Sequence, residues 1–169
     1  MKSIHLFQSF HYDVAYMDTF KGYLPRCLEI IDAGLDLLDE YPEFIFNIEQ
    51  IILLDAYWQR RPENRERLRK HAADQRLIFC PGLRTMPDGN IPSAESCYQN
   101  ALLSRRWLQE NIGAEPGPVC WVADIFGHHA QSPQIYKQLG YDLYMFERGQ
   151  LENENAVDFR WRASTARSC

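Results

Sequence analysis

Residues 119–128 read VCWVADIFGH, a short apolar run that ends in a carboxylate and turns at a glycine. The run predicts a buried β-strand over residues 119–123, which the turn residues PGP at 116–118 introduce. Asp124 follows this strand directly. A carboxylate there either caps the next turn or belongs to a site at the carboxyl end of the strand, and for Asp124 taken alone we favour the cap.

The same pattern of a short apolar strand and a longer helix recurs on both sides of this stretch. The first expected helix has five apolar residues on one face, at helical spacing: Leu24, Leu28, Ile31, Leu35 and Leu38. Ser93 is a suitable N-cap for the third. Further strands are predicted over 4–10, 44–48, 77–80 and 141–146, and helices over 20–40, 51–75 (continuous, or broken near Pro62), 93–111 and 131–139.

Strands that alternate with helices predict an α/β protein with parallel strands. An open doubly wound sheet and part of a β/α barrel both fit, and both place chemistry at the carboxyl ends of strands. A closed barrel usually needs more than ~200 residues, so this 169-residue chain suggests an unfinished one. We expect residues 1–162 to form the domain, with a sixth strand beginning at 159–162, and residues 163–169 to be a ragged or truncated tail.

Composition narrows the class of protein. The net charge of −5 argues against a nucleic-acid partner, and no apolar run approaches the length of a membrane span. The five cysteines are odd in number and include no CxxC pair, which argues against a disulfide framework or a thiolate metal site. The first residues show no basic, apolar leader pattern. We therefore expect a reduced, cytoplasmic protein.

The first strand leads into a second candidate site element, His11 and Asp13. Residues two apart on an extended chain point to the same side, so this imidazole and this carboxylate could grip one divalent metal ion. Nitrogen and oxygen ligands suit zinc or a neighbouring transition metal. The same pair is also explained as an ordinary polar strand end. However, the His11–Asp13 pair and Asp124 both follow strands, and parallel strands bring their carboxyl ends together. The two positions together therefore support one shared site better than either does alone.

Three further polar residues need an interpretation. Arg148, after the strand at 141–146, could fork onto the Asp124 carboxylate and hold it ionised. For His128 we expect a structural hydrogen bond, because it and the adjacent His129 cannot easily bind one ion together. We place His71 on a solvated helix face.

Taken together, these motifs resemble glycoside hydrolase family 38, the zinc-dependent retaining α-mannosidases. The resemblance runs from about residue 4 to 149, and DIFGH is its most specific part. Tyr16 stands where the family has Trp, and Ser9 where it frequently has His. Arg148 matches the family arginine that accompanies the nucleophile. The motifs that carry the likeness are HYDVAY at 11–16, PDGNIPSAES at 87–96, NIG at 111–113 and DIFGH at 124–128.

The resemblance implies the first five β/α units of a seven-stranded β/α barrel. It implies that His11, Asp13 and Asp124 bind Zn²⁺, that Asp124 is the catalytic nucleophile, and that Tyr16, Arg148 and His128 support substrate or site. The implied reaction is hydrolysis of terminal α-mannosides, such as those of mannose-containing oligosaccharides, with retention. The family's fourth zinc ligand and its acid/base Asp lie further along than residue 169. We therefore expect weak or no activity from this chain, and self-association through an unfinished barrel edge.

Two other functions compete with this interpretation. A metal-dependent polysaccharide deacetylase would use a similar incomplete barrel, but its H-x-x-x-H metal pair does not match the adjacent His128 and His129. A non-catalytic carbohydrate-binding remnant would bind sugar without turnover, and that binding would survive Asp124→Asn.

Overall fold

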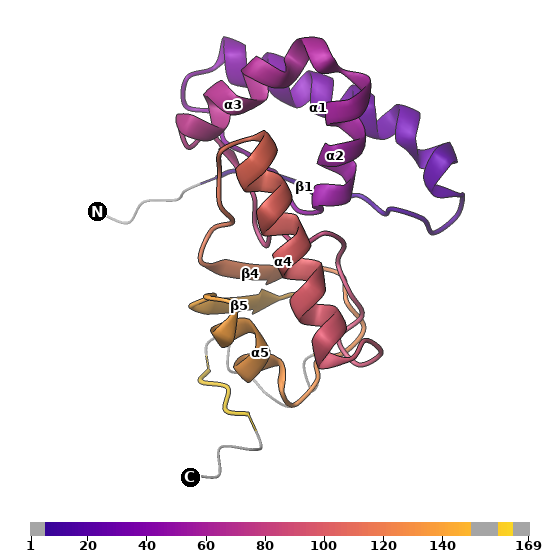
Figure 1. The fold of residues 1–169 in the computed structure, drawn as a ribbon, viewed down its shortest axis with the longest axis vertical. Coiled ribbons are helices and arrows are strands. Elements are labelled where there is room, and N and C mark those ends of the chain that lie inside the picture. The colour runs from indigo at the N-terminus through magenta and orange to yellow at the C-terminus, as the bar shows by residue number, and fades with distance from the viewer. Residues whose placement is uncertain (1–5, 150–158, 164–169) are drawn as a thin grey trace.

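The computed structural model describes residues 6–149 and 159–163 of the chain. Its elements alternate between short strands and longer helices (Figure 1). In chain order they are β1 (Gln8–Phe10), α1 (Phe20–Glu40), β2 (Phe46–Ile48), α2 (Ile51–Arg60), the 3-10 helix η1 (Pro62–Asn64), α3 (Arg65–Ala73), β3 (Leu77–Ile78), α4 (Ala94–Asn111), β4 (Val119–Val122), α5 (Ser132–Gln138) and β5 (Leu143–Phe146).

All strand pairs in this part of the chain are parallel, which confirms the predicted α/β class. The strands form two sheets, ordered β1-β2-β3 and β4-β5, in which each strand pairs with the next one in sequence. A single run of five strands was expected, and the described residues do not pair β3 with β4. A backbone hydrogen bond from the Gly117 N–H to the Phe79 carbonyl, at 3.1 Å, joins the segments that flank these two strands.

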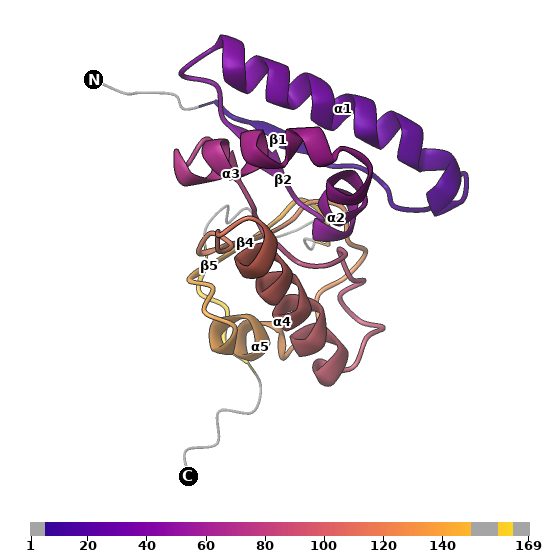
Figure 2. The ribbon, with the colours of Figure 1, turned by 45° about the horizontal axis from the view of Figure 1, so that its top comes forward.

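Helix α1 follows its sequence pattern closely. It begins and ends at the predicted residues, and all five apolar positions of the predicted face are buried. Thr19 caps its start by accepting a hydrogen bond from the Gly22 backbone N–H at 3.2 Å. The buried face packs against α2 and α3 beside the first sheet, whereas α4 and α5 accompany β4 and β5 (Figure 2).

The other helix predictions had mixed outcomes. The stretch predicted at 51–75 is broken, with Pro62 opening η1 between α2 and α3. Ser93 caps α4, accepting from the Ser96 backbone N–H at 3.2 Å.

The prediction of a sixth strand beginning at 159–162 is wrong, because residues 159–163, which the structure describes, form no strand. Residues 4 and 5 of the first predicted strand lie outside the described ranges, as do residues 164–169 of the expected tail.

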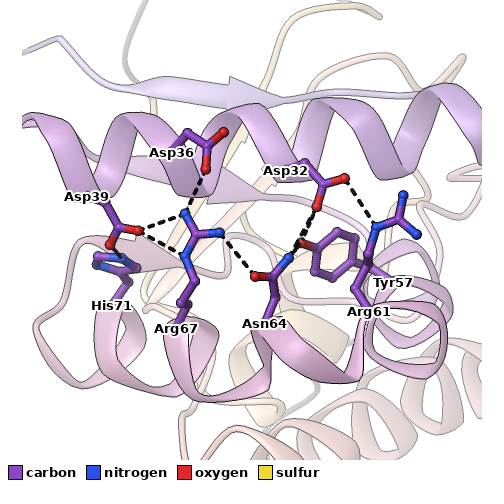
Figure 3. Close-up of polar contacts among 8 residues, drawn as sticks. All are labelled: Asp32, Asp36, Asp39, Tyr57, Arg61, Asn64, Arg67 and His71. Carbon is purple, nitrogen blue, oxygen red and sulfur yellow. Dashed lines mark hydrogen bonds and ion pairs between the residues drawn. The ribbon is translucent and has the colours of Figure 1, made fainter.

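The placement of His71 on a solvated face is also wrong, because its side chain is completely buried. Its Nε2 lies 2.7 Å from Asp39 Oδ1, and its Nδ1 lies 3.1 Å from the Arg76 guanidinium. Since arginine can only donate, Nδ1 accepts and Nε2–H donates, which is the neutral tautomer. Figure 3 shows Asp39 as one of three acidic residues of α1 that face polar residues of α2, η1 and α3.

The described residues bury two apolar cores. One lies between α1, α2, α3 and the first sheet, and it includes Ile31, Leu54 and Phe79. The other surrounds β4 and includes Val122 and Ile135. No helix among the described residues is long and apolar enough to cross a membrane.

Candidate active site

One cavity of about 320 Å³ collects residues that follow four different strands. His11 and Asp13 come after β1, Gln50 after β2, Asp88 after β3, and Asp124 after β4. Parallel strands end at the same edge of their sheets, so the chain delivers these polar groups to one place. The complete lining is His11, Asp13, Val14, Ala15, Gln50, Thr85, Met86, Asp88, Asp124, Ile125 and Phe126.

The imidazole of His11 contacts the buried carboxylate of Glu49. Its Nδ1 lies 2.7 Å from Oε2 of Glu49, whose side chain is only 1% exposed. This hydrogen bond raises the pKa of His11 above its ordinary value against the opposing effect of burial, and the negative charges of Glu49, Asp124 and Asp13 add to the increase. The negative charges around the imidazole therefore favour its protonated, positively charged form.

Asp124 meets Arg148 because of the register of β4 and β5. The ladder pairs Val122 with Phe146, and Asp124 and Arg148 each stand two residues further along their chains. Arg148 Nε lies 2.6 Å from Asp124 Oδ1. The contact is an ion pair without hydrogen-bond alignment, and Oδ1 is buried with no hydrogen-bond partner among the described residues. The buried oxygen of Asp124 is thus charge-balanced by Arg148.

Two glycines allow the loop that carries Asp88 to lie against the turn after Asp124. A Cβ on Gly89 would overlap the backbone oxygen of Gly127, and a Cβ on Gly127 would overlap the Asn90 side chain. Asp88 also accepts a hydrogen bond from the Asn90 backbone N–H at 2.8 Å. The requirement for glycine is strict at Gly89, where the group in the way is backbone, whereas the exposed Asn90 side chain can move away from position 127. The approach of the two loops brings Asp88 and Asp124 to the same cavity.

Gln50 links two loops whose residues line the cavity. Its amide donates to the Tyr12 backbone oxygen at 2.9 Å, and its carbonyl accepts from the Met86 backbone N–H at 2.9 Å. The side chain is 6% exposed, so both bonds are shielded from water. Gln50 therefore fixes the loop after β1 relative to the loop after β3.

The expected supporting residues lie around the cavity rather than in its lining. His128 bridges the Tyr144 hydroxyl at 2.9 Å and the Arg148 backbone oxygen at 2.6 Å, which is a structural arrangement. It thereby holds the chain next to Arg148 in place. Tyr16 is 77% exposed and does not line the cavity, although its neighbour Ala15 does.

Sequence reasoning missed three polar residues of this region: Glu49, Gln50 and Asp88. Glu49 and Gln50 follow directly on β2, so the rule that drew attention to His11 and Asp124 applied to them equally. Asp88 was named only within the motif PDGNIPSAES, with no role of its own. What the sequence could not show was that Glu49 contacts a residue 38 positions away.

The donor set suits a divalent metal ion. One imidazole and three carboxylates, those of Asp13, Asp88 and Asp124, line one cavity, and such nitrogen and oxygen donors are typical of zinc sites. Within residues 6–149 and 159–163, however, no three His, Cys, Asp or Glu side chains are close enough together to hold an ion. Binding would therefore require these side chains to converge. The fold and site define an α/β protein with a carboxylate-lined cavity at the ends of its parallel strands.

Comparison with known proteins defines the family. The sequence matches the glycosyl hydrolases family 38 N-terminal domain over residues 1–168, and the chain belongs to this family. It is 28% identical to alpha-mannosidase 2C1 of Homo sapiens over 146 residues, covering 86% of this chain and 14% of that protein. It is 25% identical to lysosomal alpha-mannosidase of Bos taurus, covering 98% of this chain and 18% of that protein.

A solved structure agrees with the sequence matches. The fold resembles the crystal structure of an alpha-mannosidase from Enterococcus faecalis V583, with a TM-score of 0.78 and 28% sequence identity. The match covers 85% of this chain and 16% of that one. The chain therefore spans less than a fifth of the length of each of these relatives.

Proposed function

We propose that this chain supplies the zinc-binding and nucleophile-bearing part of a retaining α-mannosidase. The observation that carries the proposal is that His11, Asp13 and Asp124, which come from two separate sheets, line one cavity. Family membership and the names of the relatives support a glycosidase acting on terminal α-mannosides, including those of mannose-containing oligosaccharides.

Asp124 is the proposed nucleophile. In the retaining scheme it would attack the anomeric carbon as the glycosidic bond breaks, and the leaving alcohol would depart with a proton from the acid/base residue. Water would then hydrolyse the resulting glycosyl ester and regenerate the carboxylate. The attack needs the carboxylate form, and the cationic Arg148, with Nε 2.6 Å from Oδ1, offsets its negative charge. We assign the acid/base role to no residue of this chain: Asp142 pairs with Lys137 on the surface, Glu147 is exposed, and Asp158 lies outside the described residues.

His11, Asp13 and Asp124 are the proposed zinc ligands. The bound ion would order neighbouring hydroxyl groups of the sugar and stabilise negative charge there. The carboxylates of Asp13 and Asp124 would offset the charge of the ion, and His11 would supply the nitrogen ligand typical of zinc sites. In the family a fourth ligand comes from beyond residue 169, so the affinity of this chain alone should be weak.

We also propose that the two sheets are neighbouring arcs of one seven-stranded β/α barrel, of which this chain forms the first five units. The consecutive strand order supports this arrangement, as does the bond from the Gly117 N–H to the Phe79 carbonyl at 3.1 Å, which links the two sheets. Leu143 and Met145 of β5 are 52% and 43% exposed, and such an open edge should favour self-association.

Calorimetric zinc titration tests this proposal, using the chain beside Asp13→Asn and Asp124→Asn. We expect one ion per chain, with binding lost or strongly weakened in both variants. Asp142→Asn is a matched control, because that aspartate is exposed and distant from the cavity lining. Absence of zinc binding both in the folded chain and in a version extended past residue 169 would refute the zinc site.

The same proteins separate the competing functions. The extended version should hydrolyse an aryl α-mannoside with retention and lose that activity in Asp124→Asn. Sugar binding that survives this substitution, with no turnover by the extended version, would instead indicate a carbohydrate-binding remnant. Release of acetate from an acetylated polysaccharide would indicate a deacetylase.

A further inference from the structure

A buried hydrogen-bond network connects the strand ends behind the cavity, and Glu49 is at its centre. Oε1 of Glu49 accepts from the Ser9 hydroxyl at 2.6 Å and from the Trp121 indole N–H at 3.0 Å. Oε2 contacts His11 Nδ1 at 2.7 Å. These three partners come from β1, the loop after it and β4, so one carboxylate joins both sheets beside the site.

The directions of these hydrogen bonds are determined by their chemistry. The Asn47 side-chain amide donates to the Ser9 oxygen at 2.9 Å, so the Ser9 hydroxyl proton points to Glu49. Asn47 is itself fixed, because it donates to the Cys80 carbonyl and accepts from the Cys80 N–H, each at 2.8 Å. The indole N–H of Trp121 can only donate. Glu49 Oε1 is therefore an acceptor with both of its bonds in use.

We propose that Glu49 is a positioning residue that fixes His11 as the Nδ1–H tautomer and so presents Nε2 to a zinc ion in the cavity. A carboxylate that accepts on both oxygens requires the proton on Nδ1, and this leaves the lone pair on Nε2. Carboxylate partners of metal-binding histidines set tautomer and orientation in this way. The zinc half of the inference rests on the proposed function, whereas the tautomer half does not.

Glu49→Gln tests the network sharply because the amide is not symmetric. The Ser9 and Trp121 protons require the amide oxygen at the Oε1 position, which places the NH₂ group against His11 Nδ1. That group donates, so Nδ1 must become the acceptor and the proton must move to Nε2. The substitution thus reverses the tautomer with almost no change of shape, and the zinc-facing lone pair is lost.

The experiment is long-range ¹H–¹⁵N correlation NMR of the histidine rings, recorded where imidazole is neutral, with His11→Asn to assign the signal. In the unmodified chain we expect a protonated Nδ1 and an unprotonated Nε2 for His11, and the reverse in Glu49→Gln. Glu43→Gln, the same change at an exposed position, should leave the spectrum unaltered. Ser9→Ala removes one donor to Oε1 and should retain the Nδ1–H tautomer.

Zinc titration of the same proteins gives the second measurement. Glu49→Gln should weaken zinc binding about 10- to 100-fold, the usual effect of losing such a partner, and Glu43→Gln should not. A proton on Nε2 in the unmodified chain would overturn the inference, even if Glu49→Gln failed to fold. An unchanged tautomer in folded Glu49→Gln would overturn it as well. Failure of the unmodified and extended chains to bind zinc would refute the proposed function, while the tautomer would still decide the role of Glu49.

Discussion

Replacing Asp39 by alanine should destabilise the chain through a residue on a different helix. Asp39 lies on α1, and it accepts from the buried His71 at 2.7 Å and from Arg67 at 2.9 Å (Figure 3). Asp39→Ala leaves the Nε2–H of His71, whose side chain is completely buried, without this acceptor. Asp36, one turn earlier, is the matched control, because Arg67 is its only ion-pair partner among the described residues and its side chain is 74% exposed.

The expected loss of unfolding free energy follows from the exposed fractions of these side chains. A buried donor that loses its acceptor costs about 1–3 kcal/mol. The partly exposed pair with Arg67 adds about 0–1 kcal/mol, so Asp39→Ala should lower the free energy of unfolding by about 2 kcal/mol. Asp36→Ala removes only a surface ion pair and should cost about 0–1 kcal/mol.

Urea unfolding followed by tryptophan fluorescence measures the difference. With a urea dependence of about 2 kcal/mol per M, the midpoint of Asp39→Ala should fall by about 1 M. The double variant Asp39→Ala/His71→Leu removes donor and acceptor together and should recover part of that loss. Equal midpoints for Asp39→Ala and Asp36→Ala would refute the argument that the buried histidine makes the difference.

Two further predictions concern acid stability and the cavity loops. Burial alone would raise the pKa of Asp39, but hydrogen bonds from His71 and Arg67 outweigh it and lower the pKa. A lowered carboxyl pKa stabilises the fold above the pKa of the unfolded chain, and this stabilisation is lost as the pH falls through the folded value. Urea midpoints measured from about pH 7 down to about pH 3 should therefore fall less steeply in Asp39→Asn. Gly89→Ala should separate the loops and weaken zinc binding, because its new methyl group would overlap the Gly127 backbone. Gly117→Ala, whose new methyl group meets no atom within 4 Å, should not, and equal zinc affinities of the two variants in calorimetry would contradict this prediction.

The sequence alone determined the elements whose signal is local. The apolar spacing and flanking residues of α1 were sufficient to place both of its ends, because the buried face of a helix repeats along the chain. The strand-end positions of His11, Asp13 and Asp124 were equally visible, since parallel strands bring their carboxyl ends together. The cavity that these three residues line is consistent with that reasoning.

Only the tertiary structure decided which polar residues are buried and what they contact. His71 looked like a solvated helix residue because its partner Asp39 is 32 positions away. The contacts of Glu49 with β1 and β4 were equally invisible, because they join residues 40 and 72 positions apart. Periodicity records which face of an element is apolar, but it contains no information on which distant side chain will satisfy a buried donor. That match depends on how the helices and sheets pack, and so the network behind His11 became visible only in the folded chain.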